Sequence, residues 1–147
     1  MSDRQLITAA MAYSYVDTRM DEFDLLSAAL TMPPPANALG HLVHSLSGDL
    51  DRSRLLVQLW GESIVSQDVA DAVEESILAR IRESINGYLV SWAERTRGLD
   101  QAAAERYAAH YVPLMVGISY GYLVQHALSP NFDGGHYLAM AHELMPE

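Results

Sequence analysis

The sequence predicts an all-α fold, in which six helices form a single domain over residues 1–147. Ala and Leu together occupy 38 positions, whereas Val, Ile and Thr together occupy only 20, and this balance favours helix over sheet. Apolar residues recur at spacings of three and four through most of the chain, which is the period of an amphipathic helix. Most of these stretches begin after a Ser or an Asp, the residue types that cap helix N-termini.

The first helix is expected from Ser2 to about Leu30. Ser2 and Gln5 have the spacing of a capping box, in which each side chain bonds the backbone N–H of the other residue. A bend is expected at the acidic cluster within 21–24. The three prolines at 33–35 then end the helix, because proline lacks a backbone N–H and fixes φ.

Two shorter helices are expected next. The second helix covers 36–47, and Gly48 is expected just beyond its C-terminus, where a left-handed residue is common. Asp49 or Asp51 is expected to cap the third helix, whose apolar residues fall within 55–64.

The fourth helix is expected to be long, from near Asp68 to Gly98. Acidic residues in its first turns are favourable next to the positive end of the helix dipole. Its apolar residues follow one another in steps of four, with one step of three: Val69, Val73, Ile77, Ile81, Ile85, Tyr88 and Trp92.

The last two helices both follow an Asp that can cap them. The fifth is expected over 100–128, and Pro113 inside it is expected to bend it, because proline removes one helical hydrogen bond. The sixth is expected over 133–145.

The composition excludes several classes of protein. No cysteine is present, which excludes disulfides, thiol catalysis and Cys-ligated metals. The nine basic residues face 19 acidic ones, so the net charge of −10 argues against direct binding of DNA or of anionic membranes. No apolar run approaches the ~20 residues that span a bilayer, and no signal peptide opens the chain, so we expect a cytoplasmic protein without membrane contact.

Motifs for catalysis and for cofactors are missing. The sequence has no glycine-rich phosphate loop, no Gly-x-Ser-x-Gly and no His-Glu-x-x-His, so we expect neither an enzyme nor a bound cofactor. His41 and His44 share one face of the second helix, but a transition-metal site needs three or four ligands. Two interpretations stay open: a metal-binding bundle, or one His in solvent and the other hydrogen-bonded at a pocket rim.

Two further patterns each allow a functional and a structural interpretation. Gly117 and Gly121 form a Gly-x-x-x-Gly pair in the fifth helix, which permits close helix packing either across a dimer or within the chain. Eight tyrosines against two phenylalanines are many for a dry core, because every buried hydroxyl needs a partner. The tyrosines therefore indicate a pocket with a few polar groups, or else a tyrosine-rich packed core.

Three segments resemble the TetR/AcrR family of bacterial transcriptional regulators. Residues 121–133 (GYLVQHALSPNFD) are similar to the Gly-Leu-x-x-Gln…Leu-x-Pro…Asp ending of that family. The long helix from Asp68 to Gly98 resembles one in the family's regulatory domain, and residues 3–7 (DRQLI) are similar to the segment after its DNA-binding module. The resemblance covers nearly the whole chain, and it implies the effector-binding and dimerisation portion of a ligand-responsive repressor.

The chain departs from that family in one respect. The helix-turn-helix domain that precedes the regulatory domain has no counterpart upstream of Asp3. Either the chain is the regulatory portion of a longer repressor, or it is a natural stand-alone module that heterodimerises with a full-length regulator. In both cases operator DNA is reached only through a DNA-binding domain that this chain does not contain.

The resemblance also implies a homodimer and a pocket for a small, mostly apolar effector. The homodimer would be a four-helix bundle made by the helices at 100–128 and 133–145 of each chain. The residues expected in the dimer interface are Pro113, Gly117, Gly121, Val124, Gln125, Leu128, Tyr137 and Ala141. The residues expected to point inward around the effector, chosen by helical phase, are Met11, Tyr15, His44, Trp60, Tyr88, Trp92, Tyr111 and Met115.

Overall fold

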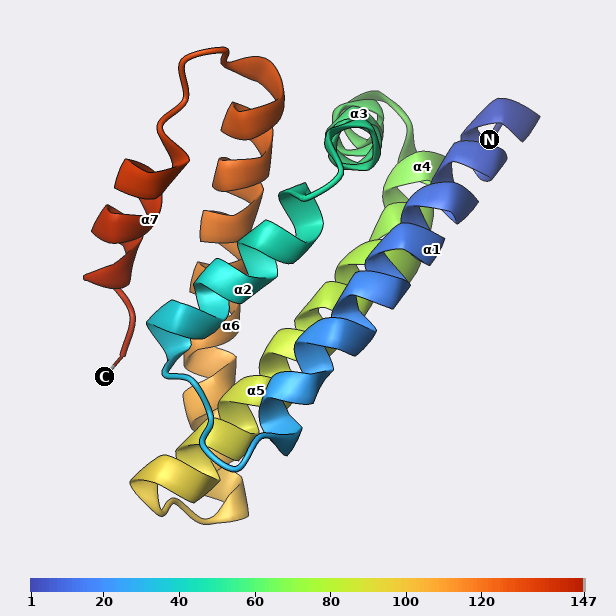
Figure 1. Cartoon of the computed structure of the whole chain (residues 1–147). Coiled ribbons are helices and arrows are strands. Elements are labelled where there is room, and N and C mark those ends of the chain that lie inside the picture. The colour runs from blue at the N-terminus through green and yellow to red at the C-terminus, as the bar shows by residue number, and fades with distance from the viewer. Residues whose placement is uncertain (147) are drawn as a thin grey trace.

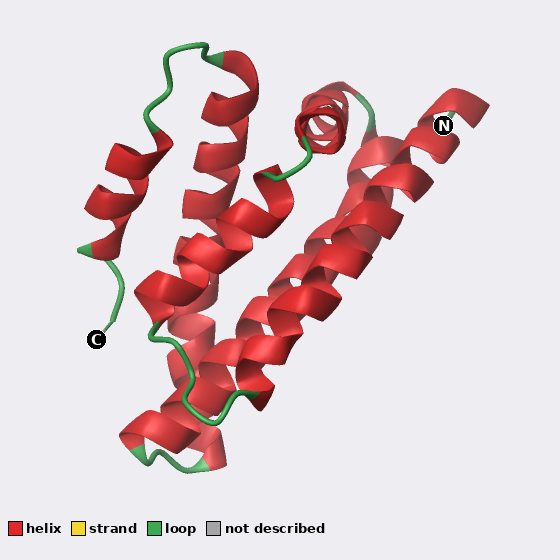
Figure 2. Cartoon of the chain, viewed as in Figure 1, coloured by secondary structure: helices red, strands yellow, loops and turns green. Residues whose placement is uncertain are grey.

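A computed structural model describes residues 1–146, and within them the chain is helical with no strand (Figures 1 and 2). The elements are α1 (Asp3–Asp24), the 3₁₀ turn η1 (Leu25–Ala28), α2 (Pro35–Ser47), α3 (Leu50–Val65), α4 (Gln67–Ala72), the π-helical η2 (Val73–Leu78), α5 (Ala79–Arg97), α6 (Gln101–Leu128) and α7 (Gly134–His142). Because α4, η2 and α5 follow one another without a break, the described chain has six main helical segments. The predicted all-α fold of six helices is confirmed.

The helices pack around the long α4–η2–α5 helix (Figure 1). α1 lies along one side of it and α6 along another, and α2 crosses between α1 and α6. α3 closes one end of this group against α1, α4 and α6. α7 returns along the outer side of α6, opposite in direction, so α6 and α7 form one edge of the molecule (Figure 1).

The helix starts follow the capping chemistry of the sequence. Ser2 and Gln5 form the expected capping box. Asp49, Asp100 and Asp133 each accept a hydrogen bond from the backbone N–H three residues later, at 3.2, 2.8 and 2.9 Å. Each of these carboxylates satisfies one of the N–H groups that the first turn leaves unpaired, which fixes where the helix begins.

The helix ends agree less well with the prediction. α1 ends at Asp24 instead of near Leu30, because the Arg95 guanidinium of α5 bonds the backbone carbonyls of Ser27, Ala29 and Leu30 and holds this segment off the helix. α7 ends at His142 instead of continuing to 145, and the next three N–H groups bond carbonyls only three residues back.

The two glycines expected at helix ends both lie there, with different backbone conformations. Gly98, which directly follows α5, has a φ of +65°, as glycine readily adopts. Gly48 directly follows α2 as predicted, but its φ is −64°, so it does not adopt the left-handed conformation that is common at this position. The chain turns directly from α2 into α3 there, and a Cβ at Gly48 would make a tight contact of 3.1 Å with the His44 carbonyl oxygen.

The acidic cluster of α1 holds the helix against its neighbour instead of bending it. Arg80 of α5 has a side chain only 13% exposed, and it reaches three aspartates of α1. Its Nε is 2.8 Å from Asp17, and one terminal nitrogen is 2.8 Å from Asp21 and 3.2 Å from Asp24. This cluster fixes α1 along the long helix.

The apolar row of the long helix is buried throughout, since each of its seven members is at most 7% exposed. Steps of four residues advance about 40° beyond a full α-helical turn, so four such steps would carry the row almost halfway round a regular α-helix. The π-helical η2 lies within these steps, between Val73 and Leu78, and its i→i+5 bonds wind more residues into a turn. This π-helical segment keeps the apolar row on one side of the helix. The steps of four between the apolar residues were the sequence signal for the segment.

Candidate functional site

The eight predicted effector residues differ in how deeply they are buried. Tyr15, Tyr88, Trp92 and Met115 are buried, and Trp60 and Tyr111 are partly buried. Met11 is 43% exposed and His44 is exposed, so neither points inward as expected. α1 and α2 turn these two side chains toward solvent, because other residues of the same helices face the core. The eight residues therefore do not surround one cavity.

Two of the buried tyrosines use their hydroxyls to bond backbone carbonyls. The Tyr15 hydroxyl of α1 donates to the carbonyls of Ser45 and Leu46, at 3.2 and 2.8 Å, where α2 ends. The Tyr88 hydroxyl of α5 donates to the Pro33 carbonyl in the proline segment. Burial raises the pKa of both hydroxyls. Tyr15 joins α1 to the last turn of α2, and Tyr88 joins α5 to the proline segment, which explains part of the tyrosine excess without a ligand.

Trp92 and Tyr111 belong to a second aromatic group, centred on Tyr107. The Tyr107 and Tyr111 rings lie 5.0 Å apart, and the Arg97 guanidinium lies 5.6 Å from the Tyr107 ring centre. Burial raises the Tyr107 pKa, and the nearby Arg97 charge and Trp92 indole N–H oppose this effect. Trp92 Nε1 and Tyr107 Oη are both buried, and neither has a hydrogen-bond partner within residues 1–146.

The remaining predicted residue, Trp60, lines a groove between α3, α4–η2 and α6, which we call the aromatic groove. Its volume is about 600 Å³. The Trp60 and Tyr120 rings form one wall, with centroids 4.4 Å apart and planes inclined by 33°. The other lining residues are Ser63, Gln67, Ala70, Asp71, Val73, Glu74, Leu78 and Val124. Such a mixture of apolar walls with a few polar groups is typical of small-molecule sites.

Two polar atoms of this wall lack partners. Trp60 Nε1 and Tyr120 Oη are both buried, and neither has a hydrogen-bond partner within residues 1–146. Burial raises the pKa of Tyr120 to about 12. Leaving a buried donor unpaired costs about 1–3 kcal/mol, so these two atoms mark a place where the fold gives up stability.

An ion pair lies beside the Tyr120 hydroxyl. Arg82 of α5 bonds both carboxylate oxygens of Glu74, and it lowers the pKa of that carboxyl. The charges of Arg82 and Glu74 act on Tyr120 in opposite directions. Glu74 belongs to η2, so the π-helical segment supplies part of the groove wall. π-Helical turns are frequent at functional sites.

Sequence reasoning missed Tyr120 and the π-helical segment as parts of a site. Trp60 and Tyr120 are far apart in the sequence, and no local pattern links them. The step of four along the long helix was the one sequence signal for η2.

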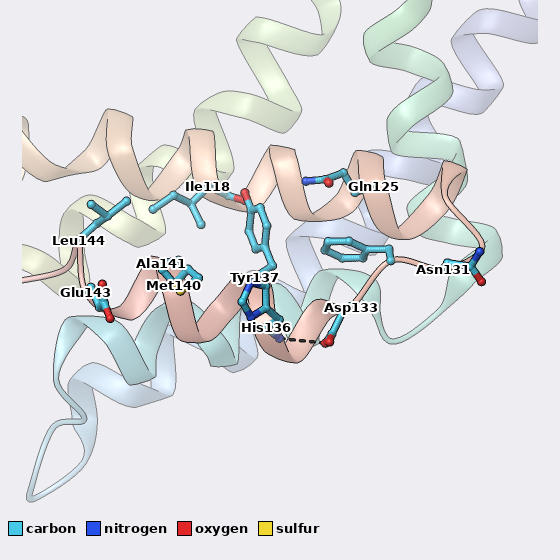
Figure 3. Close-up of a pocket in the computed structure, with 11 residues that line it drawn as sticks. Ile118, Gln125, Asn131, Asp133, His136, Tyr137, Met140, Ala141, Glu143 and Leu144 are labelled. Carbon is cyan, nitrogen blue, oxygen red and sulfur yellow. Dashed lines mark hydrogen bonds between the residues drawn. The ribbon is translucent and has the colours of Figure 1, made fainter.

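A second groove, which we call the edge groove, lies between α6 and α7 (Figure 3). Its volume is about 730 Å³. Ile118 and Gln125 line it from α6, and Tyr137, Met140 and Leu144 line it from α7 and the segment after it (Figure 3). The groove is therefore made by the two helices that were expected to dimerise.

Two tyrosine–glycine contacts hold the helices of this edge together. The Tyr137 hydroxyl donates to the Ile118 carbonyl at 2.8 Å, and it lies against Gly121, where a Cβ would be only 2.5 Å from the oxygen. In the opposite direction Tyr122 of α6 lies against Gly134, the first residue of α7. Gly121 thus serves close packing within the chain, which was one of the two interpretations left open.

The other predicted dimer residues are placed as follows. Gln125, Tyr137 and Ala141 line the edge groove, and Val124 lines the aromatic groove on the other side of α6. Pro113, Gly117 and Leu128 are exposed, and no atom lies within 4 Å of a Cβ built on Gly117. A role for these residues in a dimer stays a prediction.

His41 and His44 are both exposed, and residues 1–146 contain no group of three or more His, Asp or Glu side chains placed to hold a metal ion. In the same residues, no helix combines the length and the apolar character needed to cross a membrane.

Comparison of the chain with protein-family models, with curated proteins and with solved structures gives no match.

Proposed function

We propose that this chain is the effector-binding and dimerisation portion of a ligand-responsive transcriptional regulator of the TetR type. The observation that carries this proposal is the antiparallel pair of α6 and α7 at one edge of the molecule (Figure 1), which carries large exposed apolar side chains on a surface that we call the edge face. Such a pair is half of a four-helix bundle.

The composition of this face supports a second copy of the chain as its partner. Leu114, Leu128, Met140 and Leu144 are 36%, 67%, 50% and 60% exposed. Leu114 and Leu128 belong to α6, and Met140 and Leu144 belong to α7 and the segment after it, so both members of the pair contribute exposed apolar side chains. A two-fold axis would set this face against itself, so that each exposed leucine meets apolar side chains of the other copy. Gly117, which is open, would let the helices approach closely.

The aromatic groove supports the effector-binding part of the proposal. It has the size and the lining of a small-molecule site, and it uses α6 as one wall. Since the same helix carries the edge face, a ligand that moves α6 would change how two copies are arranged. In a dimer with DNA-binding domains, that arrangement sets the separation of recognition helices, which must match half-sites about 34–36 Å apart. The effector acts only if it binds the two arrangements with different affinity.

Sedimentation velocity tests the dimer. We expect the chain and a Gly87→Leu control to sediment as dimers of twice 16.2 kDa, and Gly117→Leu to sediment as a monomer. Gly87 is a matched control, because it is an exposed helical glycine with no atom within 4 Å of its Cβ position, and it lies on α5. A monomeric parent chain, or a dimeric Gly117→Leu, contradicts the proposed interface.

The intact mass of the protein from its native cell tests the regulator. A mass that exceeds 16.2 kDa by the size of a helix-turn-helix domain supports a repressor whose regulatory portion is this chain. A mass of 16.2 kDa favours the stand-alone module that acts through a full-length partner.

A further inference from the structure

We propose that the aromatic groove binds a planar, uncharged aromatic compound with an acceptor oxygen, such as a bicyclic lactone or ketone. This proposal rests on the function proposed above. The groove between α3, α4–η2 and α6 is the described cavity that combines a contacting pair of aromatic rings with unpaired polar atoms. Its shape, its orphaned donors and its charges each restrict the ligand.

The shape of the groove favours a flat ligand. Trp60 and Tyr120 present one aromatic wall of two mutually tilted rings, and Ala70, Val73 and Val124 supply small apolar surfaces around it. Aromatic rings pair best in offset-stacked or tilted arrangements with centroids 4.5–7 Å apart, so a planar ring fits against this wall. A volume of about 600 Å³ suits a compound of two or three rings.

The orphaned donors require an acceptor on the ligand. An indole N–H can only donate, and the Trp60 N–H has no acceptor within residues 1–146. The Tyr120 hydroxyl is also without a partner, whereas the hydroxyls of Tyr15 and Tyr137 both bond backbone carbonyls. A ligand oxygen that accepts from these two groups supplies the bonds that the chain does not.

Ligand binding also moves the groove wall. Trp60 Nε1 and Tyr120 Oη are both covered, so bonds to a ligand form only when the two rings shift. Trp60 belongs to α3 and Tyr120 to α6, so a shift between these rings acts on the contact between α3 and the helix that carries the edge face.

The charges of the groove select against an anion. Asp71 and Glu74 both line it, and the guanidinium of Arg82 is already bonded to Glu74. The chain as a whole carries a net charge of −10. A carboxylate or a phosphate on the ligand would therefore meet negative potential, and an uncharged compound would not.

Three bicyclic probes test the ligand class: coumarin, naphthalene and coumarin-3-carboxylate. Coumarin is planar and uncharged with a carbonyl oxygen, naphthalene lacks the acceptor, and the carboxylate carries a negative charge. The chain has two tryptophans, so two indole N–H signals are expected in an amide-correlation NMR spectrum, and Trp60→Phe identifies which signal is Trp60. We expect coumarin to shift the Trp60 signal and not the Trp92 signal, and to bind about 5-fold or more tightly than the other two probes.

Two tyrosine variants locate the hydrogen bond. Tyr120→Phe is expected to weaken coumarin binding about 5-fold and to leave naphthalene binding unchanged. Tyr107→Phe is the control, because Tyr107 is another partly buried tyrosine of α6 with an unpaired hydroxyl, and it does not line the groove. The proposal is overturned if coumarin does not bind, if naphthalene or the carboxylate binds as tightly, or if Tyr120→Phe and Tyr107→Phe behave alike. If the chain is a dimer but the probe and tyrosine experiments fail, the proposed ligand class is rejected. If coumarin binds to a chain that is a monomer, the proposed dimer interface is rejected.

Discussion

Replacing Gly121 with Ala tests the contact that holds α7 on α6. A Cβ at this position would lie 2.5 Å from the Tyr137 hydroxyl oxygen and 3.6 Å from the ring carbon that bears it. The first distance is too short for any real contact, and the second is ordinary. The tyrosine cannot simply swing away, because its hydroxyl is bonded to the Ile118 carbonyl at 2.8 Å.

The expected cost follows from these distances. Alanine in the middle of a helix is favoured over glycine by about 1 kcal/mol. Moving Tyr137 loses one hydrogen bond, worth about 1 kcal/mol, and adds a packing strain of about 1–3 kcal/mol. We therefore expect Gly121→Ala to lower the free energy of unfolding by about 1–3 kcal/mol, whereas Gly87→Ala, in open space on α5, raises it by about 1 kcal/mol.

Urea unfolding of the single variants and of a double variant makes the test sharp. Tyr137→Phe alone is expected to cost about 1 kcal/mol, because it removes the bond to Ile118. It also removes the oxygen with which the new Cβ clashes, so the Gly121→Ala, Tyr137→Phe double variant is expected to be about as stable as the parent. If Gly121→Ala stabilises the chain as much as Gly87→Ala does, or if Tyr137→Phe brings no rescue, the contact described for this edge is refuted.

The remaining predictions concern a charge cluster and a titration. Arg80→Gln is expected to lower the free energy of unfolding by about 1–2 kcal/mol, because it leaves three aspartates of α1 without their cation. Arg82→Gln, which removes an exposed pair with Glu74, is expected to change the free energy of unfolding by less than about 0.5 kcal/mol. Equal effects of the two variants in urea unfolding would contradict this prediction. Tyr120→Phe is expected to raise the free energy of unfolding by about 1 kcal/mol at neutral pH, because it removes an unpaired buried hydroxyl. Burial raises the Tyr120 pKa to about 12 in the folded chain against an ordinary value of 10.0, so the unfolded chain loses this proton first and stability falls as pH rises above 10. Between pH 10 and pH 12 the parent is expected to lose about 2 kcal/mol more than Tyr120→Phe, and parallel pH curves for the two proteins would exclude the raised pKa.

Local chemistry in the sequence was sufficient for the fold class and for the helix starts. Ser2, Asp49, Asp100 and Asp133 each cap the helix that follows, because a cap needs only a side-chain oxygen and an N–H three residues later. The helix end at Asp24 was misplaced, because Arg95, about seventy residues further along the chain, bonds the carbonyls that follow. Starts depend on neighbours in sequence, and this end depends on a neighbour in space.

The candidate site shows the same division. Composition and helical period by themselves determined an all-α chain with tyrosines and tryptophans on its inner faces, whereas the π-helical segment was not predicted. Only the tertiary structure decided which tyrosines are satisfied by backbone carbonyls, as Tyr15 and Tyr137 are, and which remain unpaired, as Tyr120 does. It also brought Tyr120 against Trp60 and turned Met11 outward. The reason is physical: a hydroxyl's partner and a ring's neighbour come from other helices, and the angles at which helices cross are set by packing of the whole core.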